Sequence, residues 1–236
     1  MSLESLNTEL LVCRMCPRLV AWREEVARVK RRAFCDWKYW GKPVPGFGDP
    51  QARVVAVGLA PGAHGSNRTG RMFTGDASGE FLYAALFRAG FASQPVSHHH
   101  DDGLALKDIY ITAVCRCAPP GNKPSPQEIE NCRPYLAREI EIIRPRILVA
   151  LGRVAFERIL RIINDGQPTI NNHQSPVVFA HGATYQLMTG YWLLCSYHPS
   201  RQNTQTGRLT LKMFDKVWAK VRDLLDATPQ QISSPL

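Results

Sequence analysis

The chain has 236 residues, of which 44% are hydrophobic, and this length and composition suit one large domain with a real core. No apolar run is long enough to cross a bilayer, and the N-terminal "MSLESLNTELLVC" lacks the layout of a signal peptide, so we expect a cytoplasmic protein and exclude a membrane partner. The formal net charge of +9 can simply keep the protein soluble, but it slightly favours binding to a polyanionic partner.

The first fifty residues predict two short helices, over 3–12 and 18–31, which Pro17 separates. An irregular connection rich in proline and glycine follows over 36–52. The stretch 18–42 is basic and interleaved with aromatic residues. This composition supports contact with a polyanion, although it also suits a solvated helix face.

From residue 53 onward, apolar runs alternate with amphipathic segments. We expect strands over 53–58, 109–115, 146–152 and 191–197, and helices over 77–90, 125–143, 153–164 and 209–227. Continuous apolar strands separated by helices are typical of a mostly parallel sheet covered on both faces. The sequence therefore predicts an α/β fold. We expect surface excursions over 92–106 and 165–185, the second with a small hairpin, and a disordered tail over 229–236.

Unusual loops follow three of these strands. The first reads "GLAPGAHGSNRTGRMFTGDASG" over 58–79, and the others contain "RCAPPGNKP" and "HPSRQNTQTGR". In open parallel sheets, ligands bind at the carboxyl ends of the strands, so these loops are expected to converge on one crevice. The first loop lacks both GxxxxGK[ST] and the GxGxxG spacing, which makes a nucleoside triphosphate an unfavourable ligand.

Three side chains in these loops are candidates for chemistry. Phe73 can stack on a flat ring or can pin the loop to the core, and the sequence leaves both open. Asp76 directly precedes a predicted helix, so it is a candidate N-cap as well as a functional carboxylate. His198 lies at a strand terminus before a polar, basic loop, which suits an electrophile or proton donor.

Seven cysteines in a reducing compartment favour a metal or cluster over disulfides. Cys13 and Cys16 form a CxxC pair, and Cys117 and Cys132 lie in a distant segment. Four such thiolates can bind zinc or an iron–sulfur cluster. Cys115 is an alternative to Cys117, which lies nearer the loop.

The motifs "GLAPGAHGSNRTGRMFTGDASG", "YHPSRQNTQTGRLT", "CRMCPRLVAWREEV" and "RCAPPGNKPSPQEIENC" are long and specific. Through them the chain resembles the uracil-DNA glycosylase superfamily, specifically its family 5 (UDGb-type) branch. The resemblance implies a three-layer α/β/α sandwich with a central four-stranded parallel sheet. It implies one glycosylase domain over 1–228, on which an N-terminal helical segment (1–50) packs. It also implies a [4Fe–4S] cluster on Cys13, Cys16, Cys117 and Cys132, with zinc as the alternative.

The resemblance further implies hydrolysis of the N-glycosidic bond of uracil, and of other deaminated bases such as hypoxanthine, in DNA base-excision repair. The implied enzyme is monofunctional and leaves an abasic site. Its implied partner is double-stranded DNA, with single-stranded DNA second, and it is expected to be a nucleoid-associated monomer. The implied catalytic residues are Asp76, Asn122 and His198. The implied base contacts are Gly58, Leu59, Ala60, Gly62 and Phe73. The implied DNA contacts are Ser66, Asn67, Arg68, Arg71, Ser200, Arg201, Gln202 and Asn203.

One departure concerns Leu59, because related branches carry a polar or acidic residue there to handle the water. Asp76 and Asn122 then remain as candidates for a general base. Two other functions compete with the glycosylase. One is a non-catalytic DNA-binding protein with an iron–sulfur or zinc centre, and the other is a hydrolase of free nucleosides or nucleotides.

Overall fold

A computed structural model describes residues 2–164 and 176–227 of the chain. Four parallel strands form the centre of its sheet, and all four were predicted from the sequence. They are β2 (Val54–Gly58), β3 (Ile109–Ala113), β4 (Ile147–Leu151) and β6 (Trp192–Ser196). The spatial order within the whole sheet is β1-β3-β2-β4-β6-β5. The predicted parallel centre is therefore confirmed.

Two short edge strands enlarge the sheet to six. These are β1 (Phe47–Gly48), antiparallel to β3, and β5 (Thr184–Gln186), antiparallel to β6. The first lies inside the connection predicted to be irregular, where two residues give no periodic signal. The second lies at the end of the excursion predicted over 165–185, of which 165–175 fall outside the described residues, as does the predicted tail.

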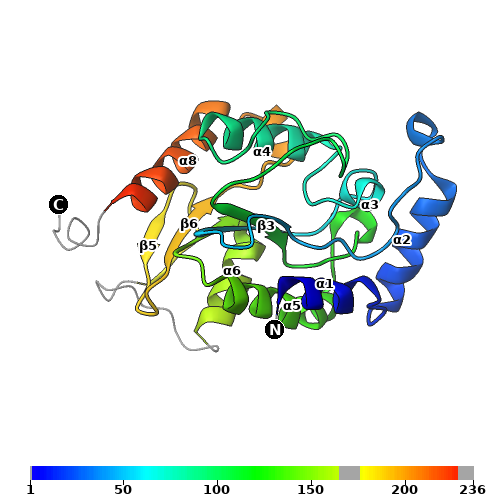
Figure 1. Cartoon of the computed structure of the whole chain (residues 1–236), viewed down its shortest axis with the longest axis horizontal. Coiled ribbons are helices and arrows are strands. Elements are labelled where there is room, and N and C mark those ends of the chain that lie inside the picture. The colour runs from blue at the N-terminus through cyan, green and yellow to red at the C-terminus, as the bar shows by residue number, and fades with distance from the viewer. Residues whose placement is uncertain (1, 165–175, 228–236) are drawn as a thin grey trace.

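Helices cover both faces of the sheet, as Figure 1 shows. On one face lie α4 (Ala77–Arg88) and α8 (Leu211–Asp226), and on the other lie α5 (Pro126–Ile143) and α6 (Arg153–Ile163). Each face of the sheet has its own hydrophobic core. Neighbouring residues of one strand pack into opposite cores, because side chains alternate along a strand. Val54 packs in the first core and Val55 in the second. The predicted α/β/α layering is confirmed.

The N-terminal segment packs beside the helix layer formed by α5 and α6. It contains α1 (Leu3–Leu11), α2 (Pro17–Val29) and the short helix η1 (Arg32–Phe34). Leu6 and Leu10 of α1 pack with Tyr135 of α5, which fixes this segment to the sandwich. Within the residues described, no helix has the length and apolarity that a membrane span requires.

Local sequence signals explain where the main helices begin. Ser125 caps α5 in a capping box with Glu128, and Pro126 occupies the first turn, as predicted. Asp76 caps α4, and Thr210 caps α8. Three shorter helices lie in the loops at the carboxyl ends of the strands. They are α3 (Ser66–Thr69), η2 (Pro120–Asn122) and α7 (Arg201–Gln205).

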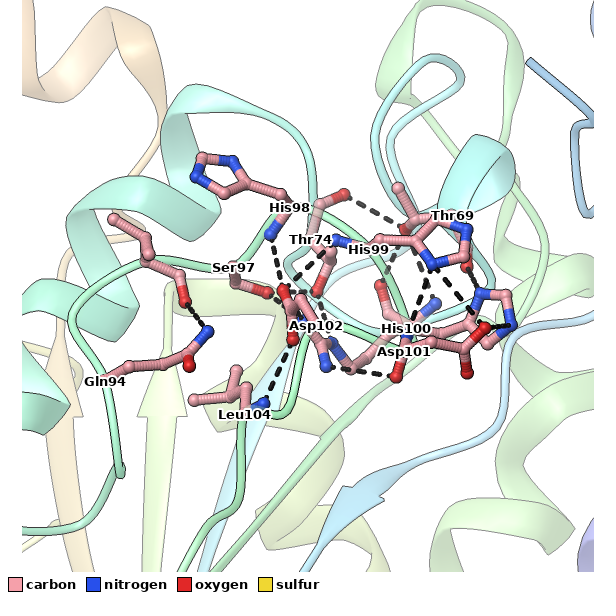
Figure 2. A network of polar contacts seen from close by, with 12 residues as sticks. Thr69, Thr74, Gln94, Ser97, His98, His99, His100, Asp101, Asp102 and Leu104 are labelled. Carbon is pink, nitrogen blue, oxygen red and sulfur yellow. Dashed lines mark hydrogen bonds and ion pairs between the residues drawn. The ribbon is translucent and has the colours of Figure 1, made fainter.

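A buried ion pair anchors the excursion 92–106, whose ends meet in a bridge between Ala92 and Leu106. The Arg71 side chain is only 3% exposed, and its Nη2 donates to Asp102 Oδ2 at 2.6 Å. Backbone N–H groups of this excursion converge on the same carboxylate (Figure 2). Burial opposes ionisation of Asp102, but the Arg71 hydrogen bond and these N–H groups outweigh it and hold the pKa below its usual range.

Replacing this carboxylate should destabilise the protein. The Asp102→Asn variant leaves the Arg71 guanidinium buried without a counter-charge, and we expect the free energy of unfolding at pH 7 to fall by about 3–5 kcal/mol. Because the folded-state pKa is lowered, the wild-type stabilisation is present above the unfolded pKa and is lost as pH falls through the folded one. Denaturant titration with EDTA present measures the free energy of unfolding at pH 7 and its dependence on pH. The control is Asp101→Asn, which replaces an exposed carboxylate. Equal stability of the two variants would contradict the assignment.

Candidate active site

A cleft of about 830 Å³ opens at the carboxyl ends of the parallel strands. The loops that follow β2, β3 and β6 all contribute to its wall, so the predicted convergence is confirmed. The predicted site residues that line it are Leu59, Ala60, Gly62, Ser66, Phe73, Asp76, Asn122, His198, Ser200, Arg201 and Gln202.

The Phe73 ring lies across the end of β2. A Cβ atom on Gly58 would stand 2.6 Å from the Phe73 ring, so the absence of a side chain there makes room for it. The ring also stacks on His198, with centroids 5.8 Å apart. The Phe73 backbone has a φ of 54°, which is uncommon for a bulky residue. Phe73 thus packs against the strand while it faces the cleft.

The Asp76 carboxylate has both of the roles that the sequence left open. Its Oδ1 accepts the Gly79 N–H at 3.0 Å and caps α4. Its Oδ2 faces Gly62 and Gly65, where a Cβ atom would collide with it. Burial raises the pKa of Asp76, although backbone N–H groups at the helix start oppose the rise. Asp76 therefore places a desolvated carboxyl group on the cleft wall.

His198 faces this wall from the loop after β6. Burial lowers the pKa of His198 to about 4, so the ring is neutral at neutral pH and carries one N–H donor. Asn203 Nδ2 donates to the His198 carbonyl at 2.8 Å, and the Asn203 N–H donates to Ser200 Oγ, which caps α7. The Asn203 side chain thus holds the backbone that carries His198, instead of standing free for the predicted DNA contact.

The predicted DNA contacts of three residues in the first loop need correction, because their side chains lie in the interior. Arg68 stacks between Phe34 at 4.0 Å and Trp37 at 3.9 Å, and it donates to the carbonyls of His64 and Gly75. Arg71 is paired with Asp102, as described above. Asn67 is fully buried and donates to the Arg23 carbonyl. These side chains shape the loop from inside, whereas Arg201 and Gln202 are exposed at the cleft.

Several residues of the cleft were not singled out from the sequence. Arg31 and Phe34 come from the N-terminal segment and line the cleft beside His64. The Tyr39 hydroxyl lies 3.1 Å from His64 Nδ1 and orients that ring. Burial lowers the pKa of His64, and neighbouring arginines add to the effect. A histidine among the glycines of "GAHGS" was the available signal for His64, but only the fold brings Arg31 and Phe34 to the site.

Four cysteines line a second, smaller cavity, at the start of α2 and the side of α5. They are Cys13, Cys16, Cys117 and Cys132, the set implied by the resemblance. Cys115 does not line this cavity, and its thiol interacts with Cys132 from behind. The geometry thus supports Cys117 over Cys115 as a ligand.

The polar surroundings of this cavity suit an anionic group. Arg23 Nη1 donates to Cys117 Sγ at 2.8 Å, and Asn131 Nδ2 donates to Cys16 Sγ at 3.4 Å. Buried N–H groups of Arg23 and Arg116 have no partner among the described residues. A tetrahedral zinc ion would hold thiolates ~3.8 Å apart. In the described parts of the chain, no three cysteine sulfurs lie within 4.8 Å of one another, so the thiols as they stand do not form a tetrahedral zinc site.

Comparison with known proteins agrees with this geometry. The profile of the "Uracil DNA glycosylase superfamily" matches residues 45–222. The chain belongs to this superfamily. A Mycobacterium leprae protein named Type-5 uracil-DNA glycosylase is 52% identical over 225 residues, which cover 94% of this chain and 96% of that protein. Proteins of the same name from Thermus thermophilus (52% identical, 95% and 99% covered) and Pyrobaculum aerophilum (45%, 88% and 87%) are also similar.

A steric test addresses the contact between Gly58 and Phe73. The Gly58→Ala variant places a methyl group against the Phe73 ring, and we expect it to lower the free energy of unfolding by about 1–3 kcal/mol. In the double variant with Phe73→Ala, the same methyl group meets no ring, so the two costs should not add. Chemical denaturation of the two single variants and the double variant measures the coupling. Strict additivity would contradict the packing described here.

Proposed function

We propose that this protein is a uracil-DNA glycosylase. It hydrolyses the N-glycosidic bond of uracil, and of other deaminated bases including hypoxanthine, in DNA during base-excision repair, and it leaves an abasic site. The observation that carries this proposal is the meeting of a neutral His198, a half-buried Asp76 carboxyl group and the Phe73 ring in one cleft. The names of the similar proteins support it over most of the chain.

The chemistry requires two developing charges to be stabilised. Cleavage leaves positive charge on the sugar and negative charge on the departing base. His198 donates its N–H to an oxygen of the base, and the ionised Asp76 lies near the sugar. Both groups are half-buried in the wall of the cleft, where preorganised charges and dipoles act more strongly than in bulk water. A neutral histidine suits this role because it is a donor that does not pair with Asp76 as an ion.

The base must leave the DNA stack before it reaches these groups. Phe73 stacks on the extruded base, and the backbone of Gly58, Leu59, Ala60 and Gly62 contacts its edge. Leu59 offers no polar group to the water. Asn122, exposed at the mouth of the cleft, orients the water through its amide oxygen, and the Asp76 carboxylate accepts the proton that the water loses. The short helix η2 presents Asn122 beside Lys123.

Double-stranded DNA is the proposed substrate, with single-stranded DNA second. Ser200, Arg201 and Gln202 lie along the cleft rim, where they contact the strand around the extruded nucleotide. We also propose that residues 1–228 form one domain that acts as a monomer at the nucleoid. The competing non-catalytic DNA-binding function gives no reason for His198 and Asp76 to share a cleft.

We further propose a [4Fe–4S] cluster on Cys13, Cys16, Cys117 and Cys132. When bound, the cluster supplies iron–thiolate bonds that join the N-terminal segment to α5. Arg23 offsets its negative charge, and the remaining N–H groups of Arg116, whose own charge is balanced by Glu139, can donate to it. The thiol cavity and the cleft have no lining residue in common, so the ligands hold the fold together and take no part in hydrolysis.

The function is tested by single-turnover excision from a uracil-containing duplex. We expect the wild type to release uracil and Asp76→Asn to be slower by roughly 10²–10³-fold, the scale of losing one preorganised electrostatic contact, while duplex affinity stays unchanged. The control is Glu80→Gln, an exposed carboxylate in the first turn of the same helix, which should excise at the wild-type rate. Equal rates for Asp76→Asn and wild type would remove Asp76 from the mechanism.

The protonation of Asp76 and His198 determines how the excision rate depends on pH. Because the pKa of Asp76 is raised, the rate should fall on acidification at a pH above the ordinary aspartate range. The pKa of His198 is lowered to about 4, so no loss should centre near pH 6.5. Profiles of rate against pH for wild type and Asp76→Asn distinguish the contributions of the two residues. The variant should lack the decrease in rate that protonation of Asp76 causes. A midpoint near 6.5 that persists in Asp76→Asn would contradict a neutral His198.

The cluster is tested by a matched pair of serine substitutions. Cys117→Ser should lose visible absorbance and iron, because it removes a ligand, whereas Cys115→Ser should retain both. The two sites are two residues apart on one segment, and both are buried. Iron analysis and absorbance spectra of anaerobically purified protein give the readout. The reverse pattern would make Cys115 the ligand.

A further inference from the structure

Three side chains of the excursion 92–106 meet outside the cleft. These are His99, His100 and Asp101, and one potential ligand atom of each lies within 4.8 Å of the others. Figure 2 shows them gathered beside Thr69. His99 is half-buried, and the other two are exposed. Two imidazoles and a carboxylate form a donor set for transition metals, unlike the purely acidic clusters common on protein surfaces.

The His100 ring is oriented by a backbone carbonyl. Its Nδ1 lies 3.2 Å from the Thr69 carbonyl oxygen, which can only accept, so Nδ1 carries a proton. Ligating histidines in proteins are typically fixed by this kind of hydrogen bond from the other ring nitrogen. His100 Nε2 then points at Asp101 Oδ2 across 3.0 Å. Two acceptors at this distance require a shared cation between them, either a proton or a metal ion.

The His99 ring approaches the same oxygen from the other side. Its Nδ1 is 3.7 Å from Asp101 Oδ2 and accepts the Asp101 N–H at 3.2 Å, so this nitrogen bears a lone pair. A metal ion would take that lone pair in place of the Asp101 N–H. The ring is flanked by His100 at 4.1 Å and by Trp37 at 5.6 Å between centroids. A tetrahedral zinc ion separates its nitrogen and oxygen ligands by ~3.4 Å, and the observed 3.0 and 3.7 Å lie on either side of that value.

We propose that His99, His100 and Asp101 bind one divalent transition-metal ion of the zinc class, with water completing its coordination. The buried Arg71, whose Nη1 donates to the His100 carbonyl at 3.4 Å, is already paired with Asp102, which offsets its charge. The bound ion would connect three parts of the chain: the excursion itself, α3 through the Thr69 carbonyl, and the N-terminal segment through Trp37. The proposal stands independently of glycosylase activity.

Zinc titration of untagged protein by calorimetry tests the site. The variants are His100→Ala and Asp101→Asn, and the control is His98→Ala, an exposed histidine next to the set but outside it. All variants keep the seven cysteines, so any zinc bound by thiols is common to every titration. Wild type and His98→Ala should bind one more zinc ion than His100→Ala, or bind it at least about tenfold more tightly. Asp101→Asn should weaken the same site.

Two results would overturn the proposal. One is equal zinc stoichiometry and affinity in wild type and His100→Ala. The other is an equal loss in His98→Ala and His100→Ala, which would indicate loose chelation by any two histidines of the run. Magnesium serves as the ion control, since it prefers oxygen ligands and should not compete with zinc.

Discussion

The active-site loop depends on two guanidinium groups that lie inside the protein. Arg68 is held between Phe34 and Trp37 and donates to carbonyls on both sides of α3, and Arg71 bonds Asp102 and the hydroxyls of Thr74 and Ser97. A loop with so many glycines has little side-chain packing of its own, so these contacts supply its rigidity. They fix the segment that ends in Phe73 and Asp76, and the cleft chemistry follows from that placement.

The glycines and the arginines therefore act together. Gly58 admits the Phe73 ring against the strand, and Gly62 and Gly65 leave room for the Asp76 carboxylate. The N-terminal segment belongs to the same construction, because its aromatic residues cover Arg68 and its Arg31 lines the cleft. Other residues of this segment, among them Cys13 and Cys16, line the thiol cavity, so a cluster there would also hold the segment that contributes to the cleft wall.

Local patterns were enough to predict the four parallel strands, the Ser125 cap and the crevice at the strand ends. The same patterns failed where a partner is distant. No local pattern indicated that Arg71, implied to be a DNA contact, pairs with Asp102 inside the protein, because that partner is 31 residues away. Edge strands of two or three residues are set by their neighbours in the sheet, which no short window contains.

Single-turnover incubation with duplexes that differ only in one base tests the central claim most directly. The duplexes carry uracil, hypoxanthine or a normal base at one position, and alkali then reveals abasic sites. We expect abasic sites at uracil and hypoxanthine and none at normal bases. Tight, salt-sensitive binding of all three duplexes without release of any base would contradict it and would favour a non-catalytic DNA-binding protein on the same fold.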